Sequence, residues 1–249
     1  MIIIKNDTEI DLMRIAGRIV AETLLLVEKE VRPGITTAEL DRIAEEFITK
    51  HGAKPSFKGL YGFPASLCIS VNEQVVHGIP GGYVLKEGDI ISVDCGANIN
   101  GFHGDAARTF AVGNISEEAK RLIKVTEESF FKGLEFAKVG NKLTDISHEI
   151  QRYVEVSGFS VVREFVGHGI GKSVHEDPEV PNFGRPGRGP KLVAGMALAI
   201  EPMVNMGTYR VATLGDDWTV VSADKSLSAH YENTVVILPD GPEILTLIK

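Results

Sequence analysis

The chain has few cysteines, no excess of positive charge and no long apolar segment. Only Cys68 and Cys95 occur among its 249 residues, which predicts two reduced thiols and not a disulfide framework. The net charge of −8 and the isoelectric point of about 5.4 argue against a nucleic-acid-binding protein, because such proteins usually carry a basic surface. The longest purely apolar run, Met196 to Ile200, is far shorter than the roughly 18 residues of a membrane-span candidate.

Several familiar signals are also absent. The first residues contain no basic stretch followed by an apolar one, as a secretory signal would require. No glycine-rich phosphate loop occurs, and His175-Glu176 lacks the second histidine of a zincin motif. The sequence therefore predicts a cytoplasmic protein without nucleic-acid specificity or membrane attachment. Its length and its hydrophobic content of 43% suit one compact domain over residues 1–249.

What the sequence does contain is four acidic residues placed beside apolar, β-prone segments. Asp94 and Glu201 each end such a segment, while Asp105 and Glu232 each open one. An ionised carboxylate inside an apolar strand is very costly unless it is paired or binds a metal ion. Four acids at matched places therefore predict one shared compensating charge.

The four acids lie in two copies of one sequence unit. The repeated patterns are Leu85-x-x-Gly88-x-x-x-x-x-Asp94 with Leu192-x-x-Gly195-x-x-x-x-x-Glu201, His103-x-Asp105 with His230-x-Glu232, and Gly34 to Gly52 with Gly140 to Gly158. A period of about 100 residues that occurs twice indicates a duplicated half-domain and not a solenoid. The predicted halves are residues 1–113 and 114–249, and each supplies two acids.

Apolar periodicity and capping residues predict two helices in each half. One helix covers residues 8–31, a second follows the Thr36-x-x-Glu39 capping box, a third follows Ser116, and a fourth contains Ile146 and Tyr153. The segments predicted to be strands are about 65–71, 89–97, 106–112, 159–166, 196–204, 218–222, 228–238 and 243–248. This order favours an α+β fold in which each half packs two helices on an antiparallel sheet. The Pro- and Gly-rich segment from Pro178 to Pro190 is predicted to be a substrate-side loop.

The acids and one histidine form a candidate metal-ligand set. His168 lies in the glycine-rich segment Gly167 to Gly171, where ligands can approach closely. A set of oxygen and nitrogen donors without thiolate suits Mn, Fe(II), Co or catalytic Zn better than a structural zinc site. Two metal ions held by shared carboxylates are a recurrent hydrolytic arrangement.

Two further histidines occupy repeat-related positions. His77 and His175 each follow a valine and are followed closely by a proline. An imidazole there could hydrogen-bond a scissile carbonyl or a developing oxyanion. The remaining candidates could line a specificity pocket beside the charged groups. They are Phe57, Leu60, Tyr61, Phe63, Cys68 and Trp218.

These residues and their neighbours carry a family resemblance that covers nearly the whole chain. The motifs are Phe63-Pro64, Cys68 to Glu73, His77-Gly78-Ile79-Pro80, Gly88 to Gly96 around Asp94, Gly104-Asp105, Gly167 to Gly171, His175-Glu176-Asp177-Pro178, Glu201-Pro202-Met203 and Tyr231-Glu232. Together they resemble a methionine aminopeptidase of the bacterial type I form. That family has the pseudo-two-fold pita-bread fold, which agrees with the internal repeat.

The resemblance implies a role for each candidate. The ligands of two divalent ions would be Asp94, Asp105, His168, Glu201 and Glu232, with Asp105 and Glu232 bridging. A bridging water or hydroxide would attack the carbonyl after the initiator methionine of nascent chains, preferably before a small second residue. Glu201 would shuttle the proton, His175 would stabilise the tetrahedral intermediate, and His77 would contact the scissile amide. Phe63, Cys68 and Trp218 would line the methionine pocket beside both histidines.

Other implications concern ions and partners. Asn72 and Ser228 match a monovalent-cation site near the pocket. A monomer with transient access to the ribosome is expected. Leu60, Phe63 and Val174 depart from residues common in the family's pocket but remain apolar, so methionine preference should survive while pocket shape differs.

Three alternatives stay open at the level of the sequence. A prolidase or Xaa-Pro aminopeptidase would share fold and metals but usually has an additional N-terminal domain. A non-catalytic binding protein on the same fold would be expected to have lost ligands, yet all five candidates are present. A structural metal protein would tend to use cysteine ligands.

Overall fold

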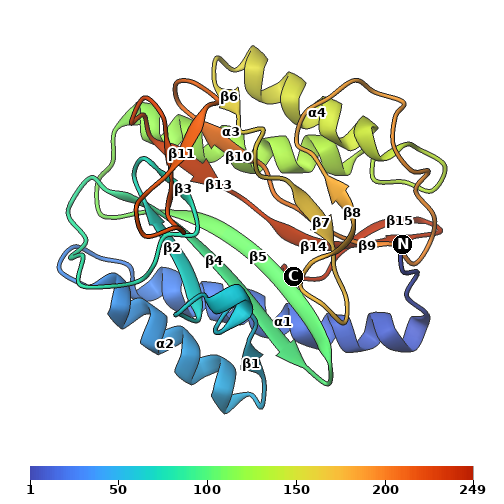
Figure 1. Ribbon diagram of the computed structural model, residues 1–249, viewed down its shortest axis with the longest axis horizontal. Helices are drawn as coiled ribbons and strands as arrows, with labels where there is room; N and C mark the ends of the chain where they lie inside the picture. The colour runs from blue at the N-terminus through green and yellow to red at the C-terminus, as the bar shows by residue number, and fades with distance from the viewer. Residues whose placement is uncertain (249) are drawn as a thin grey trace.

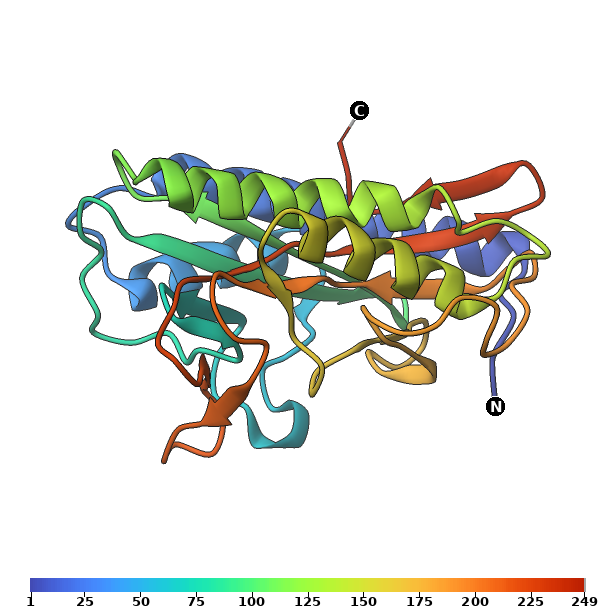
Figure 2. The same cartoon turned by 90° about the horizontal axis from the view of Figure 1, so that it is seen from above.

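The computed structural model describes residues 1–248, in which helices pack against antiparallel sheets (Figure 1). The elements are α1 (Asp7–Glu30), α2 (Thr37–Lys50), β1 (Lys54–Pro55), the 3-10 turn η1 (Leu60–Gly62), β2 (Leu67–Val71), β3 (Gln74–Val76), β4 (Ile90–Ile99), β5 (Phe102–Ala111), α3 (Glu117–Leu134), α4 (Leu143–Val156), β6 (Ser160–Val161), β7 (Gly167–Gly169), β8 (Glu176–Val180), β9 (Ala197–Ile200), β10 (Met203–Asn205), β11 (Val211–Thr213), β12 (Val220–Ser222), β13 (Ser228–His230), β14 (Asn233–Leu238) and β15 (Gly241–Ile244). Helices α1 and α3 lie along one side of the sheets, and the β11–β12 hairpin projects from the opposite side (Figure 2).

All four helices begin close to the predicted positions. Asn6 starts α1 with a complete capping box, because its side chain and that of Glu9 each accept a backbone N–H of the other. The box predicted at Thr36 is only half formed: Thr36 accepts the Glu39 N–H at 3.1 Å, but the Glu39 carboxylate instead pairs with Arg42. Ion pairing on the exposed helix face competes here with the cap.

The repeated sequence units adopt the same local structure. An isolated antiparallel bridge joins Thr36 to Val84 in the first copy, and its counterpart joins Lys142 to Lys191 in the second. The repeated glycines have matching left-handed backbones, with φ of 94° and 99° at Gly34 and Gly140, 75° and 83° at Gly52 and Gly158, and 92° and 86° at Gly88 and Gly195. Residues with a Cβ rarely adopt this conformation.

In the first half, β4 and β5 form one uninterrupted hairpin. Its two-residue turn is Asn100-Gly101, with φ of 54° and 80°, as a type I′ turn requires. The predicted strands over 89–97 and 106–112 are therefore too short, and the Asn-Gly signal explains their extension. Asp105 consequently lies within β5 and does not open a strand as predicted.

In the second half, the corresponding strands are interrupted at the acids. The predicted strand over 196–204 is divided into β9 and β10, and the strand over 228–238 into β13 and β14. The register is unchanged across the break, since Ile200 pairs with Asn233 and Met203 pairs with His230. Pro202 has no N–H to donate to the ladder, which accounts for part of the interruption.

Other differences from the predicted strands arise because strands form through pairing with partners that local sequence patterns do not indicate. Strand β8 forms at the start of the predicted Pro- and Gly-rich loop because it pairs with β7. Strand β3 joins β12 and β11 in a small sheet that combines both halves. The predicted strand over 159–166 shrinks to β6, and the last strand is Gly241–Ile244 instead of 243–248.

Close packing of α1 on β5 fixes the first half. A Cβ on Gly104 would lie 2.8 Å from the backbone nitrogen of Gly17, so a glycine is needed where strand and helix approach. Separate apolar clusters form around Leu67 and Val93 in the first half and around Phe130 and Leu198 in the second. No helix within residues 1–248 is long and apolar enough to cross a membrane.

Candidate metal centre

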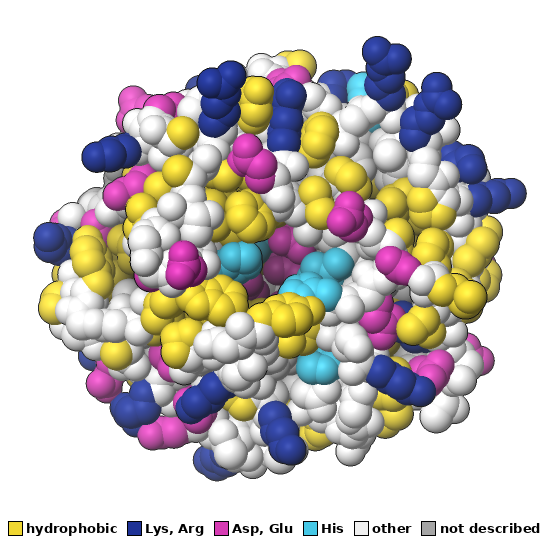
Figure 3. Space-filling model, viewed as in Figure 1, with side chains coloured by type: hydrophobic (Ala, Val, Ile, Leu, Met, Phe, Trp, Pro, Cys, Tyr) yellow, Lys and Arg dark blue, Asp and Glu magenta, His cyan; other side chains and the backbone are white. Residues whose placement is uncertain are grey.

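A cavity of about 700 Å³ opens on one face of the molecule, and α1 and α3 lie on the other side of the sheets. Figure 3 shows acidic side chains deep in a hollow of this face, with histidines at its sides. The cavity is lined by every predicted metal ligand, by both predicted catalytic histidines and by all six candidates for the specificity pocket. These residues are Phe57, Leu60, Tyr61, Phe63, Cys68, His77, Asp94, Asp105, His168, His175, Glu201, Trp218 and Glu232.

The first half contributes Asp94 from β4 and Asp105 from β5. Asp94 pairs with Ala107 across the hairpin, and Asp105 pairs with Gly96. Side chains alternate along a strand, so both acids point to one face while Cys95 packs in the core behind them. A Cβ at Gly96 would lie 2.9 Å from the Phe57 ring, so glycine there allows the cavity wall to approach.

The second half contributes Glu201 and Glu232 from the interruption between its strand pairs. The Glu232 backbone does not bond to β9 but exchanges hydrogen bonds with Ala107 of β5, at 3.0 and 3.4 Å. Thr234 extends this junction, because its hydroxyl bonds both the N–H and the C=O of Asp105 at 2.9 Å. The strand break therefore brings the acids of the two halves together.

His168 on β7 completes the predicted ligand set. Its Nδ1 lies 2.9 Å from the carbonyl of Gly169, which assigns the proton to Nδ1 and leaves Nε2 as an acceptor. Nε2 lies 3.5 Å from Glu201 Oε1 and 3.9 Å from Asp105 Oδ2. Burial lowers the pKa of His168 to about 4, so the imidazole is neutral near pH 7 and suited to bind a cation.

Burial raises the pKa of all four carboxyl groups, and repulsion between neighbouring carboxylates adds to the increase for three of them. Burial raises the pKa of Asp94 to about 7. Burial also raises the pKa of Asp105, Glu201 and Glu232 well above their usual values, and neighbouring carboxylates raise each further. Without a cation, the cluster therefore retains protons at neutral pH.

The side chains fit divalent metal ions. Buried atoms without a hydrogen-bond partner within residues 1–248 include Asp94 Oδ1, Asp105 Oδ1, Glu232 Oε1 and His230 Nε2, although buried polar atoms are normally bonded. Asp105, His168 and Glu232 offer ligand atoms within 4.8 Å of one another, and Asp94, His230 and Glu232 do the same. A compensating cation would satisfy these atoms, and oxygen and nitrogen donors suit Mn, Fe, Co or Zn.

His77 and His175 face the cavity from different elements. His77 has a left-handed backbone with φ of 60°, an uncommon conformation that clusters at functional sites. Its ring is edge-on to Phe165 at 5.5 Å, and burial lowers its pKa to about 4. The exposed His175 ring stacks on Tyr61 at 5.9 Å and lies edge-on to His168 at 4.5 Å.

The loop that carries His175 is anchored by its neighbour. The Glu176 carboxylate accepts hydrogen bonds from Lys5 Nζ at 2.6 Å and from the backbone N–H of Lys172 at 2.8 Å. Both Lys5 and Glu176 side chains are almost fully buried. This pair fixes the turn before β8 and thereby the position of the His175 backbone.

An apolar pocket adjoins the acids. The Phe63 ring lies edge-on to Trp218 at 5.1 Å, and Cys68 is buried beside them with its pKa raised by burial. Leu60 and Val174, which with Phe63 are the three positions predicted to change the pocket's shape, belong to the same cluster. Its lining is therefore apolar.

The predicted monovalent-cation residues adjoin each other. The backbone N–H of Ser228 donates to the carbonyl of Asn72 at 2.9 Å. The Asn72 side chain bonds Asp89 and the backbone N–H of Ile90, and the Ser228 hydroxyl donates to the carbonyl of Val204. The cation site stays a prediction.

Three residues near the acids have no role predicted from the sequence. Phe165 and Met203 line the cavity, and His230 lies beside Glu232. His230 belongs to the repeated His-x-acid pattern, but the spacing of residues in the sequence does not predict which way its ring points. Phe165 and Met203 have no motif of their own.

Comparisons with known proteins agree over the full chain. The family model of metallopeptidase family M24 matches residues 11–239. The methionine aminopeptidase of Clostridium perfringens is 78% identical over all of both chains. A crystal structure of methionine aminopeptidase from Thermotoga maritima superposes with a TM-score of 0.98 at 48% identity, covering all of both chains. The prolidase of Pyrococcus furiosus shares the fold with a TM-score of 0.82 at 23% identity, and the chain covers 66% of it.

Proposed function

The chain belongs to the methionine aminopeptidases of metallopeptidase family M24, and we propose that it removes the initiator methionine preferentially when the second residue is small. Its α+β architecture is the predicted pita-bread fold. Metallopeptidase action on N-terminal methionine follows from the family. The substrate preference and the residue roles below are our proposal.

The observation that supports it best is the convergence of unpartnered acidic atoms from both halves at the bottom of one cavity. Asp94, Asp105, His168, Glu201 and Glu232 would hold two divalent ions, and Glu232 belongs to both groups of neighbouring donors. When bound, such ions polarise a carbonyl and lower the pKa of water enough to make it a nucleophile near neutral pH.

The protein's own groups would perform the remaining steps. A carboxylate oxygen of Glu201 would accept the proton of the attacking water and return it to the leaving amine. His175, at the cavity mouth, would donate a hydrogen bond to the developing oxyanion. His77 would hydrogen-bond the scissile amide and hold it in line.

Phe63, Cys68 and Trp218 would receive the methionine side chain, since an apolar pocket with few polar groups suits a thioether. His77 and His175 flank the space beside the acids, so a large second residue would collide with them. The acidic cavity also favours a substrate with a free amino group. A monovalent cation near Asn72 and Ser228 would stabilise the adjoining pocket wall.

We further propose that residues 1–249 act as one catalytic unit in the cytoplasm, as a monomer that meets nascent chains at the ribosome. Support comes from the hydrogen-bonded junction between Asp105 and Thr234, which couples the halves. Sedimentation velocity would show whether the protein is a monomer in solution. Cosedimentation with translating ribosomes would show whether it associates with them.

A three-peptide comparison tests the function. The metal-loaded protein should release methionine from Met-Ala-Ser, much less from Met-Leu-Ser, and nothing from Ala-Pro-Ala. Preference for Ala-Pro-Ala would indicate a prolidase-type enzyme. No turnover with Mn, Fe(II), Co or Zn would leave only a binding or structural role.

A further inference from the structure

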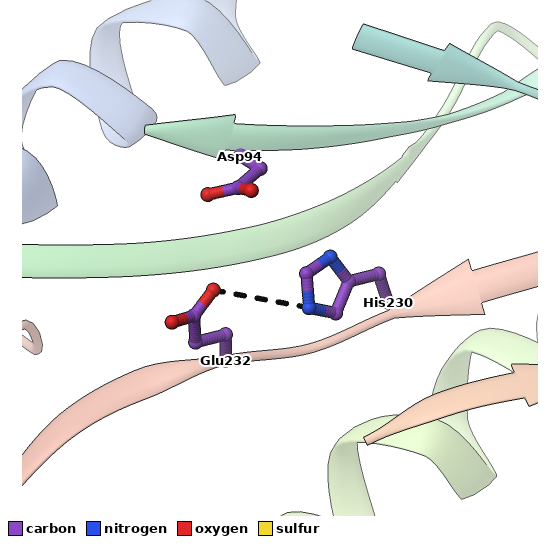
Figure 4. A group of neighbouring side chains, drawn as sticks. All are labelled: Asp94, His230 and Glu232. Atoms are coloured by element: carbon purple, nitrogen blue, oxygen red, sulfur yellow. Dashed lines mark ion pairs between the residues drawn. The ribbon is translucent and has the colours of Figure 1, made fainter. Parts of the chain in front are cut away.

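A histidine outside the predicted ligand set faces the acids. His230 ends β13, its side chain is 2% exposed, and its Nε2 has no hydrogen-bond partner within the described chain. Nε2 lies 3.8 Å from Glu232 Oε2 and 3.9 Å from Glu201 Oε2, too far for hydrogen bonds. Figure 4 shows its ring directed between Asp94 and Glu232.

The duplication supplies a direct comparison. His103 occupies the same place relative to Asp105, yet its Nδ1 lies 2.8 Å from Ser56 Oγ and its Nε2 lies 2.7 Å from Asn98 Nδ2. Its ring is therefore fully bonded within the protein, whereas His230 leaves a buried nitrogen unsatisfied. Such a group is destabilising unless something binds it.

The distances around His230 match those around His168. The predicted ligand His168 lies 3.5 and 3.9 Å from two carboxylate oxygens, while His230 lies 3.8 and 3.9 Å from two others. Metal–nitrogen and metal–oxygen bonds of about 2.0–2.2 Å place two donors on one ion roughly 3–4 Å apart. Both histidines therefore fit an ion between themselves and the acids.

We propose that His230 supplies Nε2 as a second nitrogen donor to the divalent ions, in a site formed with Asp94 and Glu232. Asp105, His168 and Glu232 would then offer donors to one ion, and Asp94, His230 and Glu232 would offer donors to the other. Glu201 remains a ligand, as in the proposed function. The inference rests on the proposed metallopeptidase function.

This arrangement has a chemical consequence. Sites made only of oxygen donors suit Mg and Mn, whereas imidazole favours Fe, Co and Zn. With a nitrogen donor in each site, both ions should be Co- or Zn-preferring, and Mg should not replace either one. Without His230 the site formed by Asp94 and Glu232 would have only carboxylate donors. With His230 this site too should prefer Co or Zn over Mg.

The test compares the wild-type chain with His230→Leu and the matched control His103→Leu. Co(II) stoichiometry and affinity are measured by equilibrium dialysis, and paramagnetic NMR counts the histidine rings with hyperfine-shifted protons. The wild type should bind two ions and show two shifted rings. His230→Leu should show one ring and bind one ion at least about 10-fold more weakly, without loss of melting temperature in the metal-free form.

His103→Leu should show the opposite result: a lower metal-free melting temperature with both rings and both affinities retained. Two shifted rings and unchanged affinities in His230→Leu would overturn the inference while leaving the proposed function intact. If the wild type with two Co(II) ions bound showed only one histidine ring with hyperfine-shifted protons, this result alone would overturn the inference. A wild type that binds no divalent ion would overturn the proposed function itself. If His230→Leu does not fold, His230→Gln replaces it, and the ring count decides in the same way.

Discussion

The two halves place their acids at equivalent sequence positions on different backbone structures. Asp94 and Asp105 lie on a continuous hairpin whose backbone groups bond each other. Glu201 and Glu232 lie where β9–β10 and β13–β14 are interrupted in register. In the first half the acids therefore lie within paired strands, whereas in the second half the backbone of Glu232 pairs outside its own sheet.

Backbone groups of the second half, next to its acids, join it to the first half. The Glu232 backbone bonds Ala107, and the Thr109 hydroxyl donates to the His230 carbonyl and accepts its N–H. A break in one duplicated sheet thus becomes the contact with the other, and the cluster forms at that contact. In the proposed function, the second half carries Glu201, which would handle the proton, and both imidazole donors, while the first half supplies Asp94 and Asp105.

The largest expected effect separates Glu201 from Asp94. Glu201→Gln should lower kcat by about 100–10,000-fold, as expected for loss of a general base, and excess metal should not restore it. Asp94→Asn should lose activity through weaker metal binding and recover partly with excess Co(II). If excess metal restored the activity of both variants, Glu201 and Asp94 would not differ in role.

A second test concerns the two histidines of the cavity mouth. His175→Ala should lower kcat by about 10–1000-fold, on the scale of one oxyanion donor, with little change in KM. His77→Ala serves as the first-half comparison. An effect of His175→Ala confined to KM would assign it to binding instead.

The junction itself can be weakened with one substitution. Thr234→Val removes a hydroxyl bonded to both backbone groups of Asp105, so unfolding free energy should fall by about 1–3 kcal/mol. Urea unfolding measures the change. Thr213→Val on the exposed β11 is the control and should stay within about 0.5 kcal/mol; equal losses in both would show that the junction contributes little.

The smallest effect is a pH dependence of the metal-free protein. Between pH 6.5 and 8 the buried histidines are already neutral, because burial lowers the pKa of His77 and His168 to about 4. The raised pKa of the acids, about 7 for Asp94, means that folding favours their protonated forms. Stability should therefore fall as pH rises through this window.

Calorimetry of the metal-free and Co-loaded forms at pH 6.5, 7.2 and 8.0 checks this prediction. The gap in melting temperature between the two forms should widen with pH. A constant gap would mean that folding does not favour the protonated forms of the buried acids.

Much of the fold could be predicted from local signals. Asn6 and Ser116 begin helices because their side chains cap the free N–H groups of the first turn. Matched patterns around Asp94 and Glu201 located the acids because duplication preserves spacing. The Asn100-Gly101 dipeptide is a hairpin-turn signal, and it predicts that β4 and β5 continue up to the turn.

The rest depends on tertiary contacts. No local pattern indicates that β3 pairs with β12, or that the strand at Glu232 exchanges one partner for another. The rings of His103 and His230 have the same sequence context but opposite hydrogen-bonding states. Only the packing of Ser56 and Asn98 around His103 distinguishes them.

Side chains of both halves converge in one cavity, and we propose that they hold the metal ions needed for aminopeptidase activity. The most direct measurement is methionine release by chelator-stripped protein during stepwise addition of Co(II), with bound metal determined at each step. Activity should be absent at the start and rise with bound metal until both sites are filled. Full methionine release by protein that carries only traces of metal would contradict the account.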